Sequence, residues 1–335
     1  MTAAQPFTTF PSTSIIGHSS LLTMSLRPKQ PHPQTDYIMA EAYKLAKSLN
    51  IISEGYESYS DFVPDLFPEA PADRVIDVTV FFNSLYYLDN IFGEDTYKAD
   101  LVSAKPELEK LLLVWMTGEI QDSSIPTIQN LMNGILWFRN TLLKKSNKTF
   151  FKKITQSLFT HLDHALNPVE YTTIEEYIAT RRWCGGMDAT LDLYDYVYEN
   201  YLPADLLKKN EYLKELYYCC NLHPTLSNDI FSYPAEVHSK YNLINALLEM
   251  KEATHLNEAI FKAIDISNEY EQQFRQLYLR REQEIAKLPI EYQIPVRYYI
   301  ESLRNCIAAS YDWQIATDRY KYIDHFLADM RIKAA

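Results

Sequence analysis

A chain of 335 residues is long enough to bury one large core or two smaller ones. Its formal charge of -12 argues against nucleic-acid binding, which needs a basic surface to meet phosphates. With only 7 glycines and no GxGxxG or GxxxxGK[ST] stretch, a large β protein or a nucleotide site built on backbone amides is also excluded.

The cysteines and the hydropathy pattern indicate a cytoplasmic protein without a membrane span. The four cysteines show no CxxC spacing, so we expect reduced thiols in the core rather than a metal site or a disulfide framework. No run of 18 apolar residues occurs, so no transmembrane helix is expected.

The chain begins with a Ser-, Thr- and Pro-rich stretch without helical periodicity, so we expect a disordered tail over residues 1–35. After it, apolar residues recur with a period close to 3.6, first in "YIMAEAYKLAKSLNII". No segment alternates at period two, no linker divides the chain, and no repeat of 20–50 residues is found. We therefore expect one all-α domain over 36–335, with a cavity between its helices. Its further helices are expected at about 72–92, 107–117, 124–145, 149–165, 173–184, 188–199, 211–231, 241–251, 256–284 and 288–316.

The expected helix over 72–92 is strongly apolar and ends in acidic residues. A carboxylate such as Asp89 beside an apolar helix face is costly unless it is paired, hydrated or metal-bound. Gly93 loosens the helix, which puts Glu94 near its end. Two interpretations stay open from these residues: a buried helix that ends in a solvated acidic turn, or a site for a hard cation such as Mg²⁺, which prefers oxygen ligands.

The stretch "NDIFSYPAE" at 228–236 places oxygen-bearing side chains, Asn228, Ser232 and Glu236, at every fourth position. On a helix these positions share one face, so the three side chains could converge on one cation. Such stripes are also common on solvated helix faces, and spacing alone favours that interpretation. Pro234 lies inside the stripe and lacks an N–H, so we expect the helix to kink or end there.

Together the two segments resemble the motifs of microbial-type class I terpene synthases. That family carries a DDxxD or DDxxxD/E motif on one helix and an NDxxSxxxE motif on a facing helix. Here "DNIFGE" at 89–94 matches the DDxxxE form with Asn90 in place of the second Asp, and "NDIFSYPAE" matches every defined position of the other motif.

Two further features of the family recur in this sequence. A diphosphate-sensing arginine precedes the Asn of the second motif by 46 residues, and position 182 is Arg. An Arg-Tyr pair closes the family's domain a few residues after a Trp, as in "WQIATDRY" with Trp313, Arg319 and Tyr320. The resemblance covers residues 36–325.

The resemblance implies a single class I terpenoid synthase-like helical bundle around a central cavity, a linear isoprenoid diphosphate as substrate, and three Mg²⁺ ions. It implies that the helix break at Gly186 directs a backbone carbonyl into the cavity. It assigns the metal to Asp89, Glu94, Asn228, Ser232 and Glu236, the diphosphate to Arg182, Arg319 and Tyr320, and catalysis to Asp89, Arg182 and Gly186.

Substrate length and assembly are less determined. The general look of the sequence favours geranylgeranyl diphosphate slightly over farnesyl diphosphate, and a dolabellane-type diterpene as the product class. A monomer or a homodimer is expected. A chain-elongating prenyltransferase, or a helical protein that only binds a partner, would also be all-α; the Asn/Ser/Glu form of the second motif argues against the prenyltransferase.

Overall fold

The computed structural model describes residues 17–26, 31–52, 59–92, 101–123, 125–166 and 169–332, without the side chains of 89–92, 101–104 and 165–166. The α-helices are α1 Thr35–Ser48, α2 Val63–Leu66, α3 Ala72–Phe92, α4 Leu101–Thr117, α5 Pro126–Lys145, α6 Lys148–Leu166, α7 Ile174–Cys184, α8 Met187–Tyr198, α9 Ala204–Lys209, α10 Glu211–Ser232, α11 Leu243–Glu249, α12 Leu256–Leu279, α13 Arg281–Ile285 and α14 Ile290–Ala316. Four 3₁₀ turns complete the elements: η1 Ser19–Leu21, η2 Tyr233–Ala235, η3 Asp318–Tyr320 and η4 Ala328–Met330.

The expected all-α fold is confirmed. Within the described ranges the structure has helices and turns but no β-strand, apart from two isolated bridges. The expected helix over 72–92 is α3 with the same bounds, and most others agree within a few residues. The long helix expected at 256–284 is two helices, α12 and α13, with a break at Arg280.

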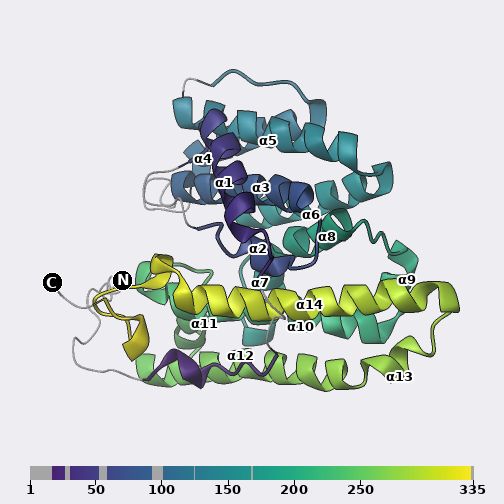
Figure 1. The fold of residues 1–335 in the computed structure, drawn as a ribbon. Coiled ribbons are helices and arrows are strands. Elements are labelled where there is room, and N and C mark those ends of the chain that lie inside the picture. The colour runs from purple at the N-terminus through teal and green to yellow at the C-terminus, as the bar shows by residue number, and fades with distance from the viewer. Residues whose placement is uncertain are drawn as a thin grey trace.

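The helices form two layers (Figure 1). The upper layer holds α1, α3, α4, α5 and α6, the lower one holds α10 to α14, and α2 and α8 lie where the layers meet. One core cluster runs through both layers, because it includes Phe81 and Phe138 of the upper layer and Leu216 and Ile300 of the lower one. The layers are therefore one packed body.

Residues 17–26 fall within the expected disordered tail, yet this segment lies along α12. The backbone N–H of Thr23 donates to Asn268 Oδ1 at 2.7 Å, and that of Ser25 donates to Glu271 Oε1 at 3.0 Å. Leu22 is 2% exposed. These bonds replace the water that an isolated strand of backbone would need, so the segment belongs to the folded domain.

In the described part of the chain, no helix is both long enough and apolar enough to cross a bilayer.

Candidate functional site

The motif "NDIFSYPAE" lies at the end of α10. The helix ends at Ser232, and the 3₁₀ turn η2, which contains Pro234, follows at once. The expectation of a helix that kinks or ends at Pro234 is confirmed, because a proline in the next turn cannot supply the N–H that an α-helix needs. The Ser232 hydroxyl donates to the carbonyl of Asn228 at 2.8 Å, which holds these two residues of the motif together.

Glu236 stays beside the motif although the helix has ended. Its backbone N–H donates to the Tyr233 carbonyl at 2.9 Å, and its Oε2 accepts from Asn242 Nδ2 at 3.2 Å. Burial and the nearby Asp229 carboxylate raise the pKa of Glu236, against the opposite effects of Arg181, Asn242 and Ser232. A carboxylate whose ionised form is disfavoured in this way would be stabilised by a bound cation.

The donor set fits a hard divalent cation. Asn228, Ser232 and Glu236 offer amide, hydroxyl and carboxylate oxygens, and Mg²⁺ prefers such ligands. A fourth residue of the motif, Asp229, does not belong to this donor set, because its carboxylate oxygens accept hydrogen bonds from other residues of the chain.

Asp229 is fully buried and accepts bonds from three residues. Arg181 donates to its Oδ1 from Nε at 2.9 Å and from Nη2 at 2.8 Å. The hydroxyl of Tyr177 at 2.5 Å and the backbone N–H of Leu243 at 3.0 Å both donate to its Oδ2. Burial raises the pKa of Asp229 while Arg181 lowers it. With all these donors engaged, Asp229 fixes the end of α10 to α7 and α11.

Arg182, the arginine selected by the 46-residue spacing, lies on another side of α7. Its guanidinium carbon is 4.4 Å from the ring centre of Trp183, 5.4 Å from that of Tyr218 and 5.9 Å from that of Tyr217. Its Nε is buried and has no hydrogen-bond partner among the described residues. The structure thus brings Arg181, rather than Arg182, into contact with the second motif. The Nε donor of Arg182 is left without an acceptor among the described residues.

The closing Arg-Tyr pair links the second motif to α3. Asn228 Nδ2 donates to the hydroxyl of Tyr320 at 2.6 Å, and Tyr320 is 3% exposed. The Arg319 guanidinium carbon lies 5.2 Å from the ring centre of Tyr59 and 5.3 Å from that of Tyr86. Tyr86 is one helical turn before Asp89 on α3. The pair therefore stands between the two helices that carry the motifs.

The expected helix break at Gly185-Gly186 is confirmed. Gly186 has φ 73°, a left-handed conformation that favours glycine, and it separates α7 from α8. Its carbonyl accepts from the N–H and the hydroxyl of Thr190, both at 3.3 Å. A Cβ added at Gly186 would lie 3.6 Å from His161 Cε1.

An apolar cavity of about 50 Å³ lies between α3, α4, α5 and α6. Phe81, Leu85, Trp115 and His161 are among its lining residues. Leu85 is four residues before Asp89 and shares its face of α3, so this apolar space adjoins the end of the helix that carries the first motif.

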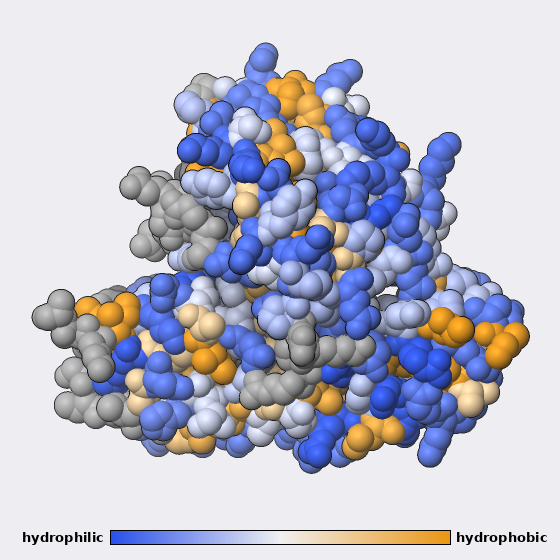
Figure 2. Space-filling view, viewed as in Figure 1, coloured by the Kyte–Doolittle hydropathy of each residue, from blue (hydrophilic) through white to orange (hydrophobic). Residues whose placement is uncertain are grey.

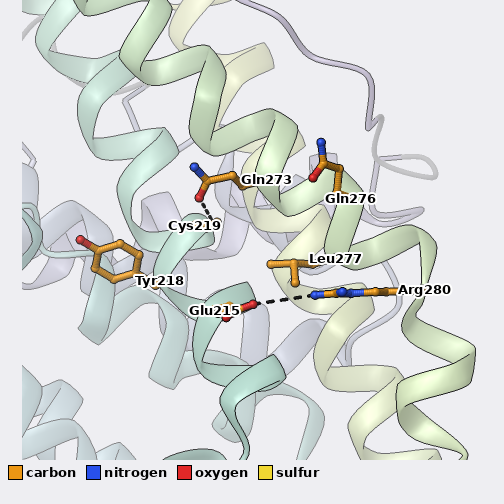
Figure 3. A pocket seen from close by; sticks show the side chains of 7 residues that line it. All are labelled: Glu215, Tyr218, Cys219, Gln273, Gln276, Leu277 and Arg280. Carbon is orange, nitrogen blue, oxygen red and sulfur yellow. Dashed lines mark hydrogen bonds and ion pairs between the residues drawn. The ribbon is translucent and has the colours of Figure 1, made fainter.

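A larger cavity of about 320 Å³ lies apart from the motifs, between α10 and α12 (Figure 3). Glu215 and Arg280 face each other across it at 3.9 Å. Its remaining lining residues are Tyr218, Cys219, Gln273, Gln276 and Leu277. None of the residues assigned to metal or diphosphate lines this cavity.

The first motif is described only in part. Asp89 lies in the last turn of α3, but its side chain is outside the described set, and Glu94 lies outside the described residues altogether. Among the described side chains, no three His, Cys, Asp or Glu groups are placed to hold a metal ion.

Sequence reasoning missed Arg181, Tyr177 and Asn242, which hold the motif from α7 and from the turn before α11. The Arg181–Asp229 pair could have been suspected from the sequence, because Arg181 is adjacent to the selected arginine and Asp229 is a defined position of the motif. Nothing in the sequence marked Asn242.

Comparisons with known proteins identify the family of this chain. The family model described as terpene synthase family 2, C-terminal metal binding, matches residues 81–273, more than half of the chain. Terpene synthase 4 of Physarum polycephalum is 23% identical over 317 residues, covering 88% of this chain and 89% of that protein. The (+)-eremophilene synthase of Gibberella fujikuroi is 26% identical over 270 residues, covering 76% and 71%.

Among solved structures, wild-type cucumene synthase has the same fold, with a TM-score of 0.72 at 16% identity, covering 88% of this chain and 99% of that one. The matched range contains the second motif together with Arg182. The chain belongs to terpene synthase family 2, and it is a terpene synthase, a lyase that cyclises an isoprenoid diphosphate and carries a divalent-metal-binding domain.

Proposed function

We propose that this enzyme catalyses the Mg²⁺-dependent ionisation and cyclisation of a linear isoprenoid diphosphate to a cyclic terpene or terpene alcohol. The observation that carries the proposal is the grouping of Asn228, Ser232 and Glu236 at the end of α10, bonded through Asn228 to Tyr320. Three oxygen ligands beside an aromatic and cationic pair suit a metal that also holds a diphosphate.

In this proposal the metal is held on both motif helices, by Asp89 and Glu94 on one side and by Asn228, Ser232 and Glu236 on the other. Three Mg²⁺ ions, when bound, neutralise charge on the diphosphate and so favour its departure. Arg182, Arg319 and Tyr320 donate hydrogen bonds to diphosphate oxygens. Arginine suits this role because its fork can meet two phosphate oxygens at once.

The hydrocarbon end of the substrate needs a dry environment that excludes water from the allylic cation. Rings gather beside Arg319: the ring centres of Phe62 and Trp313 are 4.6 Å apart, and those of Tyr86 and Trp313 are 6.0 Å apart. The faces of such rings can stabilise positive charge as it moves along the chain.

For substrate length, the general look of the sequence favours geranylgeranyl diphosphate slightly. The (+)-eremophilene synthase relative favours the shorter farnesyl diphosphate, because eremophilene is a sesquiterpene. We therefore propose farnesyl diphosphate as the first substrate to test and geranylgeranyl diphosphate as the second.

The test is incubation of the purified protein with geranyl, farnesyl or geranylgeranyl diphosphate, with Mg²⁺ or with EDTA, followed by gas chromatography–mass spectrometry. We expect a cyclic hydrocarbon or alcohol from one substrate in Mg²⁺ and none in EDTA. Asp89→Ala is the matched control, which should abolish turnover and leave the helical circular dichroism spectrum intact. A longer linear diphosphate as the product would identify a prenyltransferase, and no turnover of any substrate would contradict the proposal.

A further inference from the structure

Residues 17–22 and 325–330, together called the clasp below, meet at one end of the lower layer (Figure 1). The backbone N–H of Ser19 donates to Asp329 Oδ1 at 2.9 Å, and the Ser19 hydroxyl donates to Oδ2 of the same carboxylate. These two residues are 310 positions apart along the chain. The clasp therefore joins the first described segment to the turns that follow α14.

The clasp is part of the core. Its large apolar side chains are at most 2% exposed, and these are Leu22, Phe326, Leu327 and Met330. They share one core cluster with Phe231 of the second motif and with Tyr320. At this end of the lower layer, Figure 2 shows hydrophobic patches that are separated by hydrophilic surface. The apolar side chains of the clasp are therefore packed against the second motif rather than spread over the surface.

His325 makes the polar contact between the clasp and the second motif. Its ring is fully buried. The backbone N–H of Leu327 donates to Nδ1 at 3.0 Å, so Nδ1 is an acceptor and the ring proton lies on Nε2. Nε2 donates to the carbonyl of Phe231 at 3.1 Å. The clasp thus fixes both the orientation of the ring and the direction of its hydrogen bond.

The Phe231 carbonyl lies where α10 needs support from outside the helix. The last four carbonyls of an α-helix have no partner within it, and Pro234 prevents α10 from continuing. His325 supplies a donor at this point. Phe231 stands between Asn228 and Ser232 on the same helical turn, so the bond holds the backbone that carries both side chains.

A second connection leads from the clasp to Asn228. The backbone N–H of Tyr322 donates to the carbonyl of Met330 at 3.3 Å, and Tyr322 follows Tyr320 by two residues. The hydroxyl of Tyr320 accepts from Asn228 Nδ2 at 2.6 Å. The clasp therefore supports the second motif at its backbone and at one of its side chains.

We propose that the clasp positions the second motif for metal binding, with His325 as the positioning residue that acts through the Phe231 carbonyl. The Ser19–Asp329 pair holds the clasp closed. His325 contacts neither metal nor substrate in this proposal, because it acts through the backbone of α10. The inference rests on the proposed metal-binding role of the second motif, and it assigns a part in that role to residues outside the matched range 81–273.

The test is calorimetric titration of full-length variants with inorganic diphosphate over a series of Mg²⁺ concentrations. Two amide substitutions form a matched pair. His325→Asn keeps an acceptor for the Leu327 N–H but is too short to reach the Phe231 carbonyl, and it should raise the Mg²⁺ concentration for half-maximal binding about tenfold. His325→Gln places a donor near the position of Nε2 and should stay within about threefold of the wild type.

Urea unfolding of the same preparations shows that both variants are folded. A wild type without Mg²⁺-dependent diphosphate binding would overturn the proposed function and this inference with it. Wild-type binding that His325→Asn leaves unchanged would overturn the inference alone. An equal loss in the two amide variants would overturn it as well, because the effect would then come from the missing ring and not from the bond to the Phe231 carbonyl.

Asp329→Ala tests the closing pair without shortening the chain. The variant loses both bonds from Ser19 and should raise the same Mg²⁺ concentration about threefold, a smaller change than in His325→Asn because the packing of the clasp remains. Asp324→Ala is the matched control, since it removes the same charge from an exposed position in the turn before His325. If the two aspartate variants behave alike, the Ser19–Asp329 pair does not hold the clasp closed.

Discussion

Two places where side chains of α7 meet α10 show how differently consecutive arginines are used. At the end of α10, Arg181 is paired with the buried carboxylate of Asp229 through two nitrogens. About three turns earlier along α10, Arg182 lies against the rings of Tyr217 and Tyr218, and its buried Nε has no hydrogen-bond partner among the described residues.

The difference separates a structural role from a ligand-binding one. The two bonds that Arg181 makes to Asp229 hold α7 and α10 together, so the charge of Arg181 is neutralised within the fold. Arg182 is held in place by ring stacking, which fixes its position without using its donors. A buried donor without an acceptor is costly, and an incoming diphosphate oxygen would remove that cost.

The largest effect is expected from Arg181→Met. The variant leaves the carboxylate of Asp229 buried without its cation, which costs about 3–5 kcal/mol of stability. Urea unfolding measures the loss. The double variant Arg181→Met/Asp229→Leu should recover part of it, because the unpaired charge is then absent; if the double variant loses as much as the sum of the single ones, the pair is not what holds the helices together.

Arg182→Gln is expected to lower activity and to leave stability nearly unchanged. Loss of the guanidinium fork should lower kcat/KM by about 100-fold, or about 2.7 kcal/mol of transition-state stabilisation, while stability changes by no more than about 0.5 kcal/mol. Steady-state kinetics and urea unfolding on the same preparation check both halves. A variant that is destabilised as strongly as Arg181→Met, or that turns over at the wild-type rate, would remove the distinction between the two arginines.

His223 tests whether a buried side chain without a hydrogen-bond partner is by itself enough to indicate a ligand site. Both ring nitrogens of this α10 residue lack partners among the described residues, the side chain is 0% exposed, and burial lowers the pKa of His223 to about 4. Its folded pKa lies below the unfolded value of about 6.5, so the stability it contributes is present above that pH and is lost as pH falls toward 4.

We therefore expect the wild type to lose about 2 kcal/mol of stability through His223 between pH 7.5 and pH 5, and His223→Leu to lack this component. Urea unfolding at the two pH values measures it. Equal pH dependence in the two proteins would mean that His223 has the same pKa in the folded and in the unfolded chain, which would contradict the lowered value. In contrast to Arg182, the substitution should leave the affinity for diphosphate unchanged, because a fully enclosed ring cannot reach a ligand.

The smallest effect is expected from Tyr320→Phe, which removes the hydroxyl that accepts from Asn228 and keeps the ring beside Trp313. Turnover should fall by about tenfold, equivalent to about 1.4 kcal/mol. Product analysis by mass spectrometry should show the same skeleton, since the ring that faces the hydrocarbon is retained. A change of skeleton without a change of rate would place Tyr320 in the hydrocarbon pocket rather than at the diphosphate.

The sequence predicted α3 and the end of α10 well, because strong helical periodicity and Pro234 act locally. It also indicated Arg182, because the resembled family carries an arginine 46 residues before the Asn of the second motif. It could not predict what Arg181 does, because neighbouring positions on a helix point about 100° apart and meet different neighbours. The packing of residues 17–26 was equally hidden, since Thr23 and Ser25 bond to residues more than 240 positions away and leave no periodic pattern.

The central claim is that the end of α10 binds metal and diphosphate together. Calorimetric titration of inorganic diphosphate in the presence of Mg²⁺ tests it most directly, with wild-type protein and with Glu236→Gln, which keeps the shape of the side chain and an acceptor for Asn242 but removes the charge. We expect the wild type to bind diphosphate in Mg²⁺ and not in EDTA, and Glu236→Gln to bind it at least about 30-fold more weakly, the equivalent of about 2 kcal/mol. Binding that is independent of Mg²⁺, or that is equally tight in the variant, would contradict the account.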